Sequence, residues 1–107
     1  MNIKKDRFEK ADGTWYPQIT VSEPADMSLF EKIASVIESE IEGQWIEKLT
    51  SPDQCYWDFE TEGEKLTLHY EHYLGISIFP ADGEHHSPES IDLLKKVYQI
   101  LSNLSTP

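Results

Sequence analysis

The stretch from Gln54 to Pro80 constrains the fold most, because it contains three runs with the alternation of half-buried strands. The first two runs are separated by only a few residues. If Glu62 and Gly63 form a two-residue turn, with Gly63 supplying a positive φ, the apolar positions of both runs share one face. The predicted cross-strand pairs are Phe59 with Leu66, Trp57 with Leu68, and Cys55 with Tyr70.

The third run, around Ile76 and Ile78, joins this sheet only if its loop has the right length. A two-residue turn would move both isoleucines to the polar side, because a one-residue slip exchanges the two faces of a strand. A three-residue loop at 72–74 instead pairs Tyr70 with Ile76 and Leu68 with Ile78. We therefore predict the three-residue loop.

Further strands are expected before this stretch. Residues 15–21 read as a strand at a sheet edge, because Pro17 cannot donate a backbone hydrogen bond. Residues 44–49 are predicted as a strand despite their poor alternation, since a turn signal follows them. The first thirteen residues form either another strand or a loose basic arm.

Two amphipathic helices are also predicted. A capping box formed by Ser28 and Glu31 begins the first helix, and Gly43 is expected to end it in a left-handed conformation. The second helix is expected from Pro88, which follows a serine cap, to about Asn103.

The resulting order is strand, helix, four-strand meander, helix. It predicts one α+β domain over residues 1–107, with an antiparallel sheet of about five strands and both helices on one face. The helix-covered face would contain Cys55, Trp57, Phe59, Leu66, Leu68, Ile76 and Ile78. The open face would contain Tyr56, Asp58, Glu60, His69 and Glu71.

The net charge of −11 is the most distinctive compositional feature. Lys4, Lys5, Arg7 and Lys10 lie in the first ten residues, so from Ala11 onward eighteen acids face five bases. This charge counts against nucleic-acid and anionic-membrane binding and favours encounter with a basic partner, although it is also consistent with a simple contribution to solubility. With no signal segment and no apolar run of about 20 residues, we expect a cytoplasmic protein.

No sequence motif indicates catalysis or a cofactor. His69, Glu71 and His72 are close in sequence, but only the first two share a strand face and HExxH spacing is absent, so we expect no metal site. Asp58 and Glu60 on an open sheet face do not form the desolvated pocket that paired carboxylates need for acid–base chemistry. We expect no enzyme activity; a small hydrolase that uses His69 or Glu71 is the least favoured alternative.

An acidic surface with interspersed aromatic rings is the predicted binding site. Carboxylates accept charge-assisted hydrogen bonds from lysine and arginine, and Tyr56, Tyr73 or Phe79 could act as desolvated anchors. The predicted partner-binding residues are Tyr56, Asp58, Glu60, His69, Glu71, Asp82 and Glu84.

The segment LTLHYEHYLGISIF lies in a meander between two predicted helices of a small, acidic chain. In length, charge and element order the chain resembles the immunity proteins of bacterial contact-dependent growth inhibition and related polymorphic toxin systems. This resemblance implies a non-catalytic cytoplasmic protein, monomeric on its own. Such a protein binds one cognate basic toxin domain, often a nuclease, and blocks its active site or substrate surface.

A second interpretation belongs to another class. Secretion chaperones are similarly small, acidic and α+β, and hold an unfolded segment of a client. They usually dimerise, so a monomer would disfavour this alternative.

Overall fold

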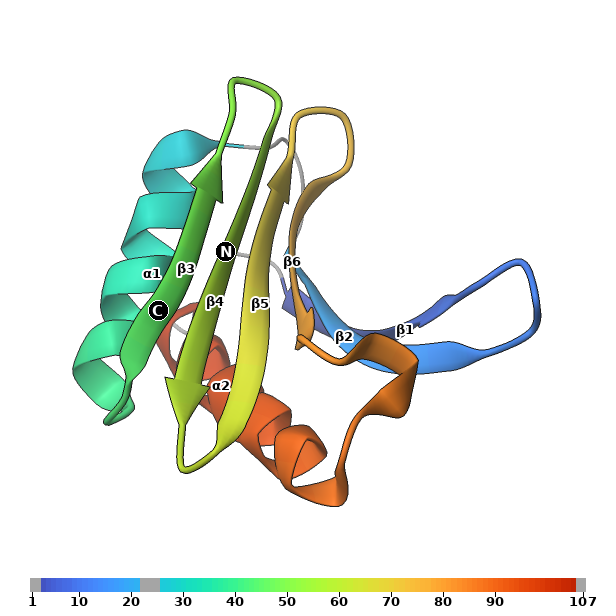
Figure 1. Cartoon of the computed structure of the whole chain (residues 1–107). Coiled ribbons are helices and arrows are strands. Elements are labelled where there is room, and N and C mark those ends of the chain that lie inside the picture. Colours follow the sequence, from blue (N-terminus) through green and yellow to red (C-terminus); the bar gives the residue numbers. More distant parts are fainter. Residues whose placement is uncertain (1–2, 22–25, 106–107) are drawn as a thin grey trace.

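The computed structural model describes residues 3–21 and 26–105. These residues form six strands, two α-helices and a short 3-10 helix (Figure 1). Their bounds are β1 (Ile3–Glu9), β2 (Trp15–Val21), α1 (Met27–Glu40), β3 (Gln44–Thr50), β4 (Gln54–Thr61), β5 (Glu64–Glu71), β6 (Gly75–Pro80), η1 (Gly83–His85) and α2 (Pro88–Ser105). Neither helix in these residues combines the length and the apolar character needed to cross a membrane.

The strands form one antiparallel sheet in the order β1-β2-β6-β5-β4-β3. This confirms the predicted α+β class. The sheet has six strands because the N-terminal segment, for which a loose arm was the alternative, pairs along β2 from Ile3 opposite Val21 to Glu9 opposite Trp15. The resulting β1–β2 hairpin projects away from the other strands (Figure 1).

The central three strands pair as the sequence predicts. Phe59 lies opposite Leu66 across a two-residue turn, in which Glu62 and Gly63 have φ values of 52° and 81°. The next connection is the three-residue loop, which places Ile76 opposite Tyr70. Both registers follow from the requirement that apolar side chains share one face of a sheet.

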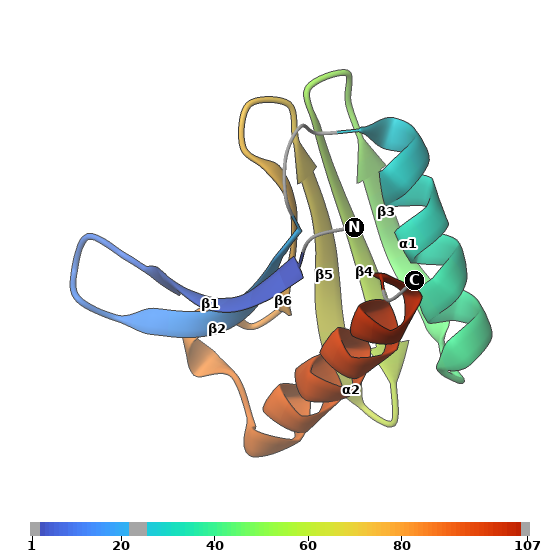
Figure 2. The same ribbon diagram turned by 180° about the vertical axis from the view of Figure 1, so that it is seen from behind.

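Both helices cover that apolar face, as predicted (Figures 1 and 2). The α1 side chain of Phe30 is fully buried and meets the rings of Trp57 and Tyr70 edge-on, with centroids 4.8 Å and 5.9 Å apart. Aromatic pairs favour this arrangement. The rest of the core includes Ile19, Val21, Ile33, Ile37, Phe59, Leu66, Leu68, Ile76, Ile78, Leu94, Val97 and Leu101.

The N-terminus of α1 differs from the prediction. The helix begins at Met27, and the Oδ1 of Asp26 accepts a hydrogen bond of 2.9 Å from the backbone N–H of Ser28. The predicted capping box of Ser28 with Glu31 is therefore wrong. Ser28 lies inside the first turn, and the aspartate before the helix satisfies one of the amides that lack an intrahelical partner.

The predicted left-handed stop at Gly43 is also wrong. Helix α1 ends at Glu40, Ile41 is already extended, and Gly43 does not have a positive φ. Glycine is required there for a different reason: a Cβ would overlap the backbone oxygen of Glu60 and the ring of Phe59. Gly43 thus allows the chain to enter β3 in close contact with the end of β4.

A β-bulge explains why β3 alternates poorly. Trp45 lies opposite Phe59, whereas the next paired residue is Glu47 opposite Asp58, so Ile46 is an extra residue. One extra residue exchanges the two faces of the remaining strand. Trp45 is therefore on the helix side with Phe59, while Glu47 is on the open side.

The position of β2 corrects the expectation for Pro17. The strand lies between β1 and β6 and not at an edge of the sheet. However, β6 pairs with β2 only from Ile19 to Val21, so no strand lies beside Pro17 on that side. Pro17 has no backbone N–H to donate, and this is tolerated because the pairing between β2 and β6 does not extend to Pro17.

The N-terminus of α2 is capped by the serine that precedes Pro88. The Oγ of Ser87 accepts a hydrogen bond of 3.1 Å from the backbone N–H of Ser90 and donates one of 2.8 Å to Glu64 on β5. These bonds join the start of the helix to the sheet. The helix then runs to Ser105, two residues beyond the predicted end.

Candidate binding face

The face of the sheet opposite the helices, seen from the front in Figure 1, is here called the outer face. Its residues alternate with the core residues of each strand. On the three central strands it includes Gln54, Tyr56, Asp58, Glu60, Lys65, Thr67, His69, Glu71, Gly75, Ser77 and Phe79. All five open-face residues predicted from the sequence therefore lie on this face.

An aromatic row crosses the outer face from β4 to β2. The ring of Tyr56 stacks on His69, with centroids 4.3 Å apart and planes at 17°. Phe79 meets the other side of His69 edge-on at 5.9 Å, and Tyr16 lies 5.5 Å from Phe79. The four rings contact one another in a continuous row, which restricts their orientations.

Within this row His69 is held in its neutral form. Its Nε2 is buried and has no hydrogen-bond partner among the described residues. Burial lowers the pKa of the imidazole from its ordinary value, and the nearby carboxylate of Glu71 opposes this effect only in part. His69 therefore contributes an uncharged ring to the row at neutral pH.

The carboxylates of the outer face lie mainly on β4 and β3. Asp58 accepts a hydrogen bond of 2.6 Å from the hydroxyl of Thr67, which is only 5% exposed. Across β3 the bulge places Glu47 directly opposite Asp58. No ion pair joins Glu47, Asp58 or Glu60 to a base within residues 3–21 and 26–105. The outer face thus has negative charge that the fold itself does not neutralise.

Glu71 has a local structural role. Its Oε2 accepts hydrogen bonds from the backbone N–H groups of Tyr73, at 2.9 Å, and Leu74, at 2.7 Å. The side chain thereby stabilises the three-residue loop between β5 and β6. Across the described parts of the chain, no three or more histidine, cysteine or acidic side chains come together as a possible metal site.

The remaining two predicted residues lie at the far end of the aromatic row. Asp82 is exposed and lines a shallow hollow beside Tyr16 and Phe79. Burial raises the pKa of the Tyr16 hydroxyl there, while Lys10 acts in the opposite direction. Glu84 belongs to η1, but its side chain is outside the described part of the structure.

The edge strand β3 is protected against pairing with another strand. The bulge at Ile46 interrupts its regular edge. After the bulge Lys48 lies on the helix side, with its Nζ 4.4 Å from the ring centroid of Trp57 and 5.6 Å from that of Trp45. A lysine directed toward the core side of an edge strand disfavours the addition of a further strand.

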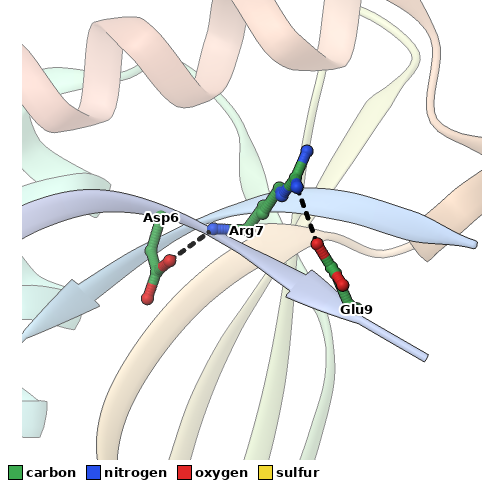
Figure 3. A network of polar contacts seen from close by, with 3 residues as sticks. All are labelled: Asp6, Arg7 and Glu9. Carbon is green, nitrogen blue, oxygen red and sulfur yellow. Dashed lines mark hydrogen bonds and ion pairs between the residues drawn. The ribbon is translucent and has the colours of Figure 1, made fainter. Parts of the chain in front are cut away.

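At the opposite edge, β1 holds much of the basic charge of the chain. Arg7 pairs with Glu9 at 2.7 Å, its backbone N–H donates to Asp6 at 2.8 Å (Figure 3), and its guanidinium lies over the ring of Trp15 at 5.5 Å. Lys5 similarly lies 4.7 Å from the ring centroid of Tyr98 on α2. These bases contact the hairpin and α2, far across the sheet from Glu47 and Asp58.

A family model described as "Protein of unknown function (DUF3630)" matches residues 13–99. The chain belongs to the DUF3630 family. The matched part of this DUF3630 chain begins at the tip of the β1–β2 hairpin and ends within α2, so it includes the whole aromatic row and the acids of β3 and β4. Neither a curated protein nor a solved structure matches the chain.

Sequence reasoning missed several outer-face residues of the DUF3630 domain. Glu47 and Leu49 reach this face only because of the bulge, for which the disturbed alternation of β3 was the available signal. Tyr16 has the opposite parity to Ile19, which could have placed it on the outer face once β2 was aligned with β6.

Proposed function

We propose that this chain is a non-catalytic inhibitor that binds a cognate basic toxin domain through its outer face. The observation that supports this proposal is the combination of packed rings with Glu47 and Asp58, two carboxylates that have no ion-pair partner among the described residues. Tyr56 is 39% exposed and adjoins Asp58 on β4. Such a face can offer both an anchor and a charged surround to a partner.

The charges and rings of this face would act at different stages of binding. Carboxylates such as Glu47 and Glu60 attract a basic surface over a distance and raise the association rate, especially at low salt. Rings that become desolvated in the complex, such as Tyr56, mainly slow dissociation. A toxin inhibitor needs both properties, because it has to capture its target early and release it rarely.

A nuclease is the expected class of toxin. Nucleases bind a polyanionic substrate, so their substrate surfaces carry lysine and arginine. A sheet face with Glu47, Asp58 and Glu60 is complementary to such a surface and could cover it sterically. In this proposal the free protein is a cytoplasmic monomer, and its own acidity disfavours binding to nucleic acid.

The first experiment identifies the partner. The tagged protein is used to capture proteins from its native host at low and at moderate salt, and the co-eluting proteins are identified by mass spectrometry. We expect one folded basic domain at a one-to-one ratio, whose toxicity is neutralised by this chain. A client held through an extended segment by a dimer would overturn the proposal in favour of a secretion chaperone.

Charge-reversal variants then test the surface. Asp58→Lys combined with Glu60→Lys should lower the association rate of the captured domain by at least about tenfold at low salt. The matched control is Glu31→Lys combined with Glu38→Lys, which changes the net charge equally on the exposed side of α1. Equal association rates for the two double variants would show that the outer face is not the binding surface.

The protected β3 edge supports the inhibitor over the chaperone alternative. Holding an extended client commonly involves addition of the client as a further strand. The bulge at Ile46 and the inward position of Lys48 oppose this mode at β3.

A further inference from the structure

The corner of the outer face formed by β3 and β4 combines two properties, one of charge and one of exposed apolar surface. Glu47 lies directly opposite Asp58, and Leu49 lies directly opposite Tyr56. Leu49 is 57% exposed and Tyr56 is 39% exposed. The corner therefore has two adjacent carboxylates beside two large exposed apolar side chains.

The pair of carboxylates is unfavourable in the free protein. Side chains directly opposite in an antiparallel pair have Cβ atoms about 5 Å apart, and like charges at this distance reduce the stability of the sheet. Neither Glu47 nor Asp58 has an ion-pair partner among the described residues. Lys48, the nearest base in sequence, is turned to the other face and lies over Trp57. A cation supplied from outside would remove this repulsion.

The ring of Tyr56 is positioned to receive a flat cation. One face of the ring is covered by His69, and its hydroxyl donates a hydrogen bond of 2.7 Å to the Oε1 of Gln54. The ring therefore loses little conformational freedom on binding. Because His69 is neutral, no positive charge behind the ring repels an incoming cation.

These features together select arginine over lysine. Guanidinium is planar, so it can stack beside an aromatic ring while donating hydrogen bonds to two carboxylates, and it is less strongly hydrated than an ammonium group. We infer that the outer face binds its partner through an arginine, seated between Tyr56, Glu47 and Asp58. This inference rests on the proposed function and specifies the chemistry of the partner residue.

The experiment uses two synthetic probes of equal charge, nona-arginine and nona-lysine, titrated into the isotope-labelled protein at fixed salt. We expect chemical-shift changes centred on Leu49, Tyr56 and Asp58. We also expect the arginine peptide to bind about two- to fivefold more tightly, which is the ratio that one exposed cation–π contact supplies. Equal affinities would overturn the inference. Chemical-shift changes centred on Glu62, Glu89 and Asp92, which line a hollow between the β4–β5 turn and α2, would overturn it as well.

Two variants test the carboxylate pair and the tyrosine ring of this corner separately. Glu47→Gln should weaken binding of the arginine peptide and at the same time raise the melting temperature of the free protein, because it removes the opposed charge. Glu38→Gln on α1 is the matched control, with the same change in net charge at an exposed position. Equal affinities for the arginine peptide and equal melting temperatures of the two variants would contradict the inference.

Tyr56→Leu should retain attraction to both peptides but lose the preference for arginine. A retained preference would contradict a role for the ring. The outcomes also separate the two proposals. If the captured partner depends on Asp58 and Glu60 but the arginine preference is absent, only this inference fails. If the preference is present but no basic toxin domain is captured, only the proposed function fails.

Discussion

Tyr56 and His69 face each other across β4 and β5 as a stacked pair, with ring centroids 4.3 Å apart. Phe79 lies against the same imidazole, whose Nε2 is buried without a partner in the described structure. Protonation would place a charge between these rings in a site with little solvation. The stacked pair is therefore compatible with a neutral imidazole, and the free energy of unfolding of the protein depends on pH.

Replacing His69 by phenylalanine should reduce the loss of stability between pH 7 and pH 5. Burial places the pKa of folded His69 below its ordinary value of 6.5. As the pH falls through 6.5, the unfolded chain takes up a proton before the folded chain does, so the free energy of unfolding decreases until the folded pKa is reached. Phenylalanine retains a ring beside Tyr56 and cannot titrate. Urea midpoints at both pH values measure the difference.

The control for this prediction is His72→Phe, since His72 is exposed in the loop after β5. This variant should retain the pH dependence of the original chain. A His69→Phe protein with an unchanged difference between its two urea midpoints would contradict the assignment of the effect to His69.

Gly43→Ala should destabilise the protein by about 1–3 kcal/mol, the usual cost of forcing extra volume into a packed site. The added Cβ would overlap the carbonyl oxygen of Glu60, a backbone atom that cannot move without disturbing β4. Chemical denaturation measures the loss, and faster amide exchange in β3 should accompany it.

Gly13→Ala is a useful comparison for the Gly43 variant. Gly13 has φ of 91° at the tip of the β1–β2 hairpin, and its Cβ would meet nothing within 4 Å. We expect a cost of about 1 kcal/mol from backbone strain alone, with amide exchange in β3 unchanged. If Gly43→Ala were as stable as the original chain, the close approach of β3 and β4 would not explain this glycine.

Asp26→Ala should destabilise the protein by about 1 kcal/mol, because it leaves an N-terminal amide of α1 without its acceptor. Ser28→Ala should change the free energy of unfolding by less than about 0.5 kcal/mol, since Ser28 is exposed within the first turn. Denaturant titrations of the two variants distinguish the observed cap from the one expected from sequence. A larger effect for Ser28→Ala would reverse the assignment.

The parts of the fold that the sequence predicted correctly depend on short-range periodicity. Leu66 was expected to face Phe59, and Ile76 to face Tyr70, because a slip of one residue in either register would have exposed apolar side chains. The same arithmetic placed Tyr56 and His69 together on the outer face. For these residues, the cross-strand partners follow from the alternation within each strand and the length of the loop between the strands.

The features that the sequence did not predict depend on contacts between distant segments. Gly43 resembled a helix stop, but glycine is needed there because a Cβ would overlap the backbone oxygen of Glu60, seventeen residues later. The place of Ile46 as a bulge could be recognised only once β3 was aligned with β4. Glu47 was consequently missed as a member of the outer face, although it lies directly opposite Asp58 and adds to the negative charge of that corner.

The position of Lys48 over Trp45 and Trp57 has a consequence for aggregation at the β3 edge. A sheet protein can grow into fibrils by adding strands at a free edge. Here the side chain that shields two tryptophans also interrupts the template that such growth requires. The same lysine thus lets the core extend to the last strand while it opposes edge-to-edge association there.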